Sequence, residues 1–369
     1  MRPRLLLQPV CCSWSCVGRS TARDFVLHMK RPSSLSLAAR MCASIPFSFL
    51  DMVKSTRLFS FYYHVVSNEE VPHVKNLYAH KTIREFRDDL DFLLRHFAPI
   101  SMAELLDLVN RGCPFPRKRF LLTFDDGFRE MHDIVAPILI EKGVSATFFV
   151  NTAFIDNNEM CYLNKASLLV EKLDRARSTT LEQAITALLH SKGVMSQDAR
   201  SGILSINYKG KSLLEEIADV MDVDFSSYLA TNQPYLKAKQ ISSLIEDGFS
   251  IGAHSIDHPL YSSLSLAEQV NQTITSVSSI RNTFNLNYGV FAFPHGDNNV
   301  SQEYFTQVDS YGLIDLSFGT AGLLEDSAPR NIQRVNLENP RCPAETILSY
   351  NQARRLKHVL MGKAMIARA

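Results

Sequence analysis

The sequence has no strong excess of charge, no long apolar run and few cysteines beyond its first fifty residues. Its 39 basic and 38 acidic residues give a formal net charge of +1, which excludes the global field expected of a protein that binds nucleic acid or an anionic membrane. No later window approaches the roughly 18 apolar residues needed to span a bilayer. We therefore expect no integral membrane segment, and a soluble, cytoplasmic protein in preference to an organellar or exported one.

Cysteine usage excludes a disulfide scaffold. Four of the seven cysteines fall within residues 1–50, and Cys113, Cys161 and Cys342 are widely scattered. Neither a disulfide framework nor a CxxC zinc site can be read from these spacings. Cys113 and Cys161 have no base partner in the sequence pattern, so we do not expect either to be a nucleophile.

Residues 1–52 have the composition of a tail. Seven Lys or Arg residues within the first fifty stand against the single acid Asp24. An acid-poor, Arg- and Ser-rich start is typical of a transit peptide, whereas a signal peptide would need a continuous apolar core. A poorly structured tail, or an over-extended start with Met41 or Met52 as the true beginning, fits equally well, and these alternatives remain open.

From residue 58 onward, short apolar runs alternate with helical patterns. The 46% apolar composition is enough to build one large core. Capping boxes at Thr82 with Glu85, Ser101 with Glu104 and Ser265 with Glu268 predict helix starts. The apolar runs predict strands near 58–63, 119–124, 146–150, 249–253, 290–293, 313–318 and 332–335.

Most of these strands are followed by helices, which predicts an α/β fold, a distorted seven-stranded (β/α) barrel of parallel strands. Residues 156–236 interrupt the alternation with leucines and isoleucines at helical spacing, and we interpret them as a helical insertion. The barrel domain is expected to span 53–345, with a C-terminal helical tail over 346–369.

Polar side chains that could do chemistry follow four of the predicted strands. In a parallel barrel the carboxyl ends of the strands meet at one mouth, so residues there are expected to face a common cavity. These residues are His64, Asp125, Asp126, His254, His258 and the tripeptide Pro294-His295-Gly296.

His254 and His258 are four residues apart, which allows two imidazoles to contact one ion. The adjacent acids Asp125 and Asp126 stand before Gly127, at the end of another strand. Neighbouring side chains of an extended chain point different ways, so one carboxylate can bind a metal while the other faces a water. A site of two histidines and one carboxylate leaves positions open, as a hydrolytic metal site requires.

Two of these segments carry a family resemblance. Thr123-Phe124-Asp125-Asp126-Gly127 and His254-Ser255-Ile256-Asp257-His258-Pro259 resemble the first and second motifs of the polysaccharide deacetylases, also called NodB-homology or carbohydrate esterase family 4 proteins. The resemblance covers roughly residues 58–340. It implies that Asp125 is the general base, that Asp126, His254 and His258 hold one divalent metal ion, usually zinc, and that the barrel is of the NodB-homology type.

The third motif departs from the family pattern. The family often has an arginine two residues before its proline, where this chain has Ala292 before Pro294. That arginine normally orients the base, so its absence leaves the tuning of Asp125 unassigned. We expect His295, His132 and Arg334 to be packing or solvated residues rather than catalysts. The phenylalanine-rich version of the motif, with the strand ending in Tyr63-His64, resembles the biofilm-polysaccharide deacetylases, in which the acid histidine comes from the N-terminal strand. This makes His64 the predicted general acid. His295 follows a strand and precedes a glycine, so Pro294, His295 and Gly296 are the predicted substrate contacts, and a plain turn explains them equally well.

The predicted function is hydrolytic removal of acetyl groups from the N-acetylated sugars of a poly- or oligosaccharide, which is the expected partner. Three alternatives use the same residues: an O-acetyl esterase, a small-amide hydrolase, and a catalytically silent carbohydrate-binding barrel. The intact set of Asp125, Asp126, His254 and His258 argues against the last, because a binding module has no need of a base beside a metal.

Overall fold

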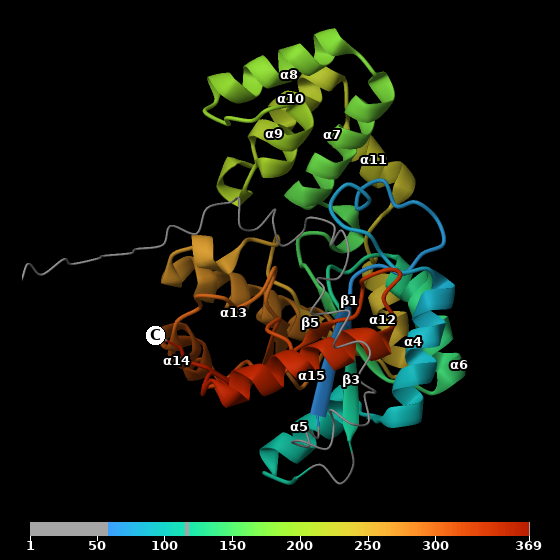
Figure 1. Cartoon of the computed structure of the whole chain (residues 1–369), viewed down its shortest axis with the longest axis vertical. Helices are drawn as coiled ribbons and strands as arrows, with labels where there is room; N and C mark the ends of the chain where they lie inside the picture. Colours follow the sequence, from blue (N-terminus) through green and yellow to red (C-terminus); the bar gives the residue numbers. More distant parts are fainter. Residues whose placement is uncertain (1–57, 115–117, 369) are drawn as a thin grey trace, which may run out of the picture.

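The structure is a computed structural model that describes residues 58–114 and 118–368 of the 369-residue chain (Figure 1). Residues 1–52, expected to be a tail or presequence, lie outside the described residues. In the part of the chain that is described, no helix has both the length and the apolar character needed to cross a membrane.

Parallel strands form a nearly closed barrel. Their order is β10-β1-β3-β4-β5-β6-β7-β9, with the two-residue β2 at Ala98–Pro99 beside β3. β9 and β10 are halves of one segment, interrupted at Arg334, that pairs with β7 on one side and with β1 on the other. Counted as one strand they give the predicted seven, which are β1 Leu58–Tyr63, β3 Arg119–Phe124, β4 Ala146–Val150, β5 Ser250–Ala253, β6 Val290–Ala292, β7 Leu316–Gly319 and β9 Asn331–Gln333 with β10 Val335–Asn336.

Helices surround this barrel, and their starts follow the capping signals. The reciprocal boxes of Thr82 with Glu85 and of Ser265 with Glu268 are both formed. The box predicted at Ser101 is half formed, because the Glu104 carboxylate pairs with Arg119 instead. The helices are α4 Ile83–His96, α5 Met102–Asn110, α6 Ala136–Lys142 after a π-helical turn at Met131–Val135, α12 Ala238–Glu246, α13 Leu266–Thr283, α14 Gln302–Ser310 and α15 Ala344–Leu360.

Alternating side chains of the strands build two cores. Phe120, Leu122 and Phe124 of β3 pack outward in a cluster that includes residues of the surrounding helices. Leu121 points the other way, into a cluster with Phe149 and other inward residues of the strands. Residues of α5 belong to this inner cluster, so α5 covers one end of the barrel (Figure 1).

Helices α7–α11 form a lobe at the opposite end, toward which the carboxyl end of β1 points (Figure 1). Their bounds are α7 Tyr162–Ala176, α8 Thr179–Ser191, α9 Ala199–Ser205, α10 Leu213–Met221 and α11 Phe225–Asn232. The core of the lobe also contains Val65, Val71 and Val74, from the segment after β1, and Phe128, which follows the Asp-Gly turn. Loops at the barrel mouth are therefore packed into the lobe.

The chain after α15 returns to the barrel. β11 at Met365–Ile366 pairs with β8 at Glu325–Asp326. The guanidinium of Arg368 is 3% exposed and pairs with the carboxylates of Asp297 and Asp326, which also accept from the side-chain amides of Asn331 and Gln333. This buried network ties the segment to β9.

Candidate metal centre and catalytic residues

The turn after β3 sends two adjacent carboxylates in different directions. Asp126 and Gly127 both have left-handed backbone, with φ of 75° and 68°. A Cβ at position 127 would lie 3.2 Å from the side chain of Val150, so glycine suits this position for both conformation and space. The turn leaves Asp125 in line with the strand and brings Asp126 out toward the mouth.

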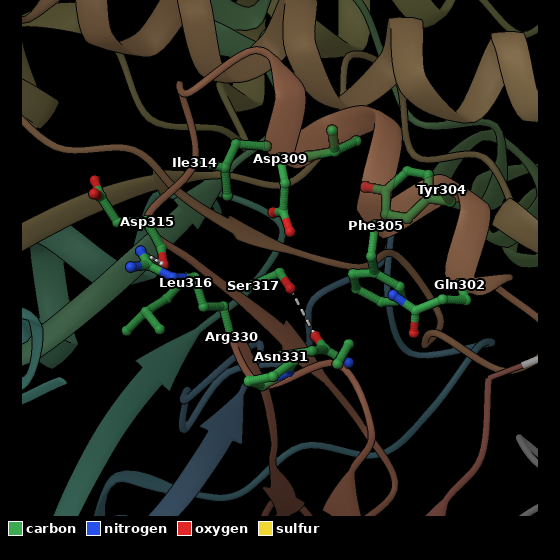
Figure 2. A pocket seen from close by; sticks show the side chains of 13 residues that line it. Gln302, Tyr304, Phe305, Asp309, Ile314, Asp315, Leu316, Ser317, Arg330 and Asn331 are labelled. Atoms are coloured by element: carbon green, nitrogen blue, oxygen red, sulfur yellow. Dashed lines mark hydrogen bonds between the residues drawn. The ribbon is translucent and has the colours of Figure 1, made fainter. Parts of the chain in front are cut away.

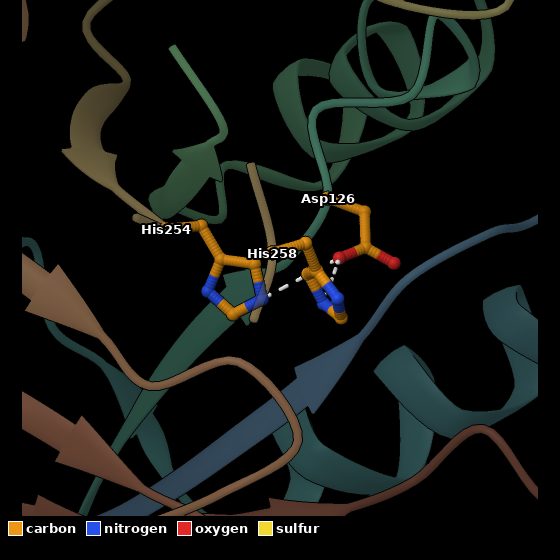
Figure 3. A group of neighbouring side chains, drawn as sticks. All are labelled: Asp126, His254 and His258. Atoms are coloured by element: carbon orange, nitrogen blue, oxygen red, sulfur yellow. Dashed lines mark ion pairs between the residues drawn. The ribbon is translucent and has the colours of Figure 1, made fainter. Parts of the chain in front are cut away.

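Asp126, His254 and His258 come together at that mouth (Figure 3). Oδ1 of Asp126 lies 3.4 Å from Nε2 of His254 and 3.1 Å from Nε2 of His258. One ligand atom from each residue lies within 4.8 Å of the others, so a single ion could contact all three. These are the three ligands that the resemblance implies.

The histidines are fixed by the backbone around them. Nδ1 of His254 lies 2.9 Å from the carbonyl oxygen of Ala292 and donates a hydrogen bond to it. Because Nδ1 carries the proton, Nε2 keeps a lone pair that points toward Asp126. His258 has left-handed backbone, with φ of 64°, and its backbone N–H donates to Oγ of Ser255. Asp257 is held by Tyr208 and Lys211, both from the lobe. The two imidazoles are thus positioned by β6, by their own tight loop and by the lobe.

The donor set fits a divalent cation. Oδ1 of Asp126 is buried yet makes no hydrogen bond within the described residues, as expected of an oxygen placed for a metal. Burial raises the pKa of Asp126, but His258 and His254 outweigh it and hold that pKa well below its usual value. The carboxylate is therefore ionised, the state that a metal ligand requires.

The carboxylate of Asp125 is clamped by Arg334. The guanidinium donates to both carboxylate oxygens, at 2.7 and 2.8 Å, and also to Oγ1 of Thr123 at 2.9 Å. Its Cζ lies over the rings of Tyr62 and Phe149, at 4.8 and 5.5 Å from their centroids. Burial raises the pKa of Asp125, but Arg334, through its charge and its hydrogen bonds, together with His254 and His64 outweighs it and holds the pKa below its usual value.

The expectation that Arg334 is a packing or solvated residue was wrong. Its side chain is fully buried and serves as the counter-ion of Asp125, from the break between β9 and β10. His132, by contrast, is partly exposed and contacts Asp133. This contact involves neither Asp125 nor the three proposed metal ligands.

His64 is held by a glutamate that the sequence analysis did not single out. Nδ1 of His64 lies 2.5 Å from Oε2 of Glu338, whose other oxygen accepts from the backbone N–H groups of His64 and Val65. Burial would lower the pKa of His64, but the Glu338 carboxylate opposes this most strongly and raises the pKa to about 9. His64 is therefore protonated at neutral pH.

The tripeptide Pro294-His295-Gly296 lies against the metal group. The ring centroid of His295 is 4.4 Å from that of His258. Burial and the neighbouring His258 hold the pKa of His295 well below its usual value, so its ring is neutral. Gly296 has a φ of 132°, and a Cβ there would come within 2.4 Å of the Thr320 hydroxyl, so this position needs glycine.

A cavity of about 180 Å³ lies elsewhere, between α14 and the strands β7 and β9 (Figure 2). Tyr304, Phe305, Leu316 and Asn331 are among its lining residues. None of the predicted catalytic or metal-binding residues lines it, so this cavity is separate from the candidate site at the mouth.

Comparison with known proteins agrees with the motifs. The polysaccharide deacetylase family model matches residues 113–313, more than half of the chain. The chain belongs to the polysaccharide deacetylase family. The prediction of a hydrolase that acts on carbon-nitrogen bonds other than peptide bonds is thereby confirmed. No curated protein matches the chain significantly.

Three solved structures resemble this one at low identity. A Streptococcus pyogenes deacetylase, PplD, in complex with acetate is 15% identical over 80% of this chain and 99% of its own, with a TM-score of 0.49. IcaB from Ammonifex degensii is 16% identical over 81% and 98%, with a TM-score of 0.49. The BpsB deacetylase domain from Bordetella bronchiseptica is 15% identical over 76% and 94%, with a TM-score of 0.44.

Proposed function

We propose that this polysaccharide deacetylase removes acetyl groups from the N-acetylated sugars of a poly- or oligosaccharide and releases acetate. The observation that carries the proposal is the division between two adjacent carboxylates. Asp126 turns toward two imidazoles, while Asp125 is held by Arg334. Metal binding and proton transfer are thus assigned to neighbouring residues that do not compete for one role.

Asp126, His254 and His258 would hold one divalent ion, which we take to be zinc. Two imidazoles and one carboxylate are a set that zinc accepts in hydrolytic sites, with positions left open for water and substrate. When bound, the ion supplies a Lewis acid that polarises the acyl oxygen and lowers the pKa of water. The fixed Nε2 lone pair of His254 supports this assignment.

Asp125 acts as general base and His64 as general acid. Asp125 takes a proton from the water that attacks the acetamide carbonyl carbon, and Arg334 keeps its carboxylate ionised and oriented. His64, protonated with a pKa of about 9, gives its proton to the nitrogen as the carbon-nitrogen bond breaks. The products are acetate and a free amino sugar.

Pro294, His295 and Gly296 are proposed to contact the sugar. Their loop packs on the metal group through His295 and His258. The neutral ring of His295 can exchange hydrogen bonds with sugar hydroxyls without bringing a second positive charge to the site.

Acetate release from acetylated chito-oligosaccharides and from acetylated xylan tests the substrate. An amide nitrogen needs a proton to leave, whereas an ester oxygen leaves more easily, so the protonated His64 favours the amide. We expect release from the chito-oligosaccharides. Release from the xylan alone would replace the proposal with an O-acetyl esterase.

Asp125→Asn is the companion variant that tests for a silent barrel. It keeps the size of the side chain but cannot take the proton, so it should retain the ion and lose most acetate release. If the wild-type protein loaded with zinc binds chito-oligosaccharide but releases no acetate from either substrate, the chain is a binding module.

A further inference from the structure

The hydroxyl of Tyr78 is buried and has no hydrogen-bond partner among the described residues. Other buried tyrosines of the molecule do have partners, as Tyr63 has Asp89 and Tyr235 has Asn164. A buried hydroxyl without a partner typically costs about 1–3 kcal/mol. Such a group in a folded protein calls for an explanation, and a ligand that supplies the missing partner is one.

Tyr78 lies at the catalytic site. Its ring is 5.2 Å from that of the proposed acid His64, between centroids, with a tilt of 43°. Burial raises the pKa of the Tyr78 hydroxyl well above its usual value, and the carboxylates of Asp126 and Glu338 raise it further. The hydroxyl therefore stays protonated as a donor.

The segment that carries Tyr78 is fixed in place. The N–H groups of Leu77 and Tyr78 both donate to the carbonyl oxygen of Val74, which is part of the lobe core. The side-chain amide of Asn76 donates to the carbonyl oxygen of Ser167 in α7. A side chain held in this way presents its hydroxyl with little loss of entropy when a ligand arrives.

We propose that Tyr78 is a substrate-binding residue, whose hydroxyl donates a hydrogen bond to an oxygen of the acetylated substrate beside His64. This inference rests on the proposed function and adds a contact from the segment between β1 and α4. The acceptor is a carbonyl or hydroxyl oxygen of an N-acetylated sugar. Both are neutral oxygens that a protonated phenol can reach as donor without a change of charge.

Tyr78→Phe tests the proposal, with Tyr228→Phe as the matched control. Tyr228 belongs to the same hydrophobic cluster, but its hydroxyl has a partner within the protein, Nδ1 of His73 at 3.0 Å. Tyr78→Phe should not lower the melting temperature, because the hydroxyl that it removes has no partner among the described residues. It should keep the ion content and lower kcat/KM about tenfold, the loss expected for one hydrogen bond to substrate. Tyr228→Phe should lower the melting temperature and leave kcat/KM of the folded protein unchanged.

Acetate affinity of the zinc-loaded protein, measured by calorimetry, gives a readout that does not depend on turnover. Weaker acetate binding by Tyr78→Phe would place the hydrogen bond on the acyl oxygen. Unchanged acetate binding with lowered kcat/KM would place it on a sugar oxygen. Wild-type values for both quantities, or a fall in melting temperature as large as that of Tyr228→Phe, would overturn the proposal. If the wild-type protein releases no acetate, the proposed function fails, and calorimetric binding of a chito-oligosaccharide then decides the case of Tyr78: weaker binding by Tyr78→Phe supports the contact, and equal binding overturns it.

Discussion

Glu338 and His64 are 274 residues apart in the sequence and form a contact of 2.5 Å between Oε2 and Nδ1. The second oxygen of Glu338 accepts from the backbone N–H of His64 at 3.0 Å, so one carboxylate fixes both the ring and its strand end. Because Nδ1 is engaged, Nε2 is the nitrogen left to exchange a proton with substrate.

This contact predicts the alkaline limb of the pH profile. Burial lowers the pKa of His64, but Glu338, with smaller contributions from Asp126 and Asp125, outweighs it and raises the pKa from 6.5 to about 9. An acid at this position therefore stays protonated until the pH rises through that value. We expect kcat/KM to fall as the pH passes about 9, and Glu338→Gln to move this limb lower by about one unit or more. Glu141→Gln, at an exposed ion pair with Arg87, serves as control. A limb that stays in place in Glu338→Gln would separate His64 from the acid step.

The same pKa shift makes folding stability depend on pH. His64 binds its proton more tightly in the folded chain, so its contribution is complete below pH 6.5 and is lost as the pH rises through about 9. The free energy of unfolding of Glu338→Gln should therefore approach that of the wild type toward high pH. Denaturant unfolding of the two proteins at pH 6 and pH 10 measures this difference, and an equal gap at both values would contradict the shift.

Arg334→Met should change both the acidic limb of the kcat/KM–pH profile and the free energy of unfolding. Without the guanidinium, the burial of Asp125 raises the pKa of its carboxyl group. As the pH is lowered, the carboxylate should therefore become protonated, and stop acting as a base, at a higher pH than in the wild type. Breaking such a pair typically costs about 3–5 kcal/mol. Arg334→Lys keeps a charge but not the two parallel bonds and should fall between the two proteins. An acidic limb that is identical in all three would show that Arg334 does not set the ionisation of Asp125.

The barrel and the metal group could be predicted because their signals are local. Each strand is an apolar run of a few residues, and the pairs Asp125 with Asp126 and His254 with His258 lie within single motifs at strand ends. The (β/α) rule then placed those ends at one mouth. Residues that are neighbours within one of these motifs are therefore also neighbours in the structure.

The roles of Arg334 and Glu338 could not be predicted, because each role depends on a partner that is far away in the sequence. Arg334 meets Asp125 across 209 residues and Glu338 meets His64 across 274, through the one segment that closes the barrel. The sequence did hold a signal for Arg334, a charged residue between Ile332 and Val335 in a predicted buried strand. A charge in that setting is rarely buried without a partner.

Metal content should separate the ligands from the base. His254→Ala removes one of three ligands, so elemental analysis should find the ion largely gone. Asp125→Asn, whose side chain faces Arg334, should retain about one ion per chain. If Asp125→Asn loses the ion and His254→Ala keeps it, the proposed roles of these residues are wrong.

The general-acid role of His64 can be tested by comparing two leaving groups. An amine anion leaves very poorly, so amide cleavage needs a proton on nitrogen, whereas the phenolate of an activated aryl acetate leaves without one. His64→Ala should therefore lower deacetylation of an N-acetylated chito-oligosaccharide by about 10²- to 10⁴-fold and hydrolysis of the aryl acetate much less. The ion should remain, because His64 is not among the three clustered ligands. If His64 instead served only to cap the aromatic strand β1, the variant would lose stability and both activities would fall equally. Equal losses in a folded, ion-loaded His64→Ala protein, or no loss on either substrate, would remove His64 from the mechanism.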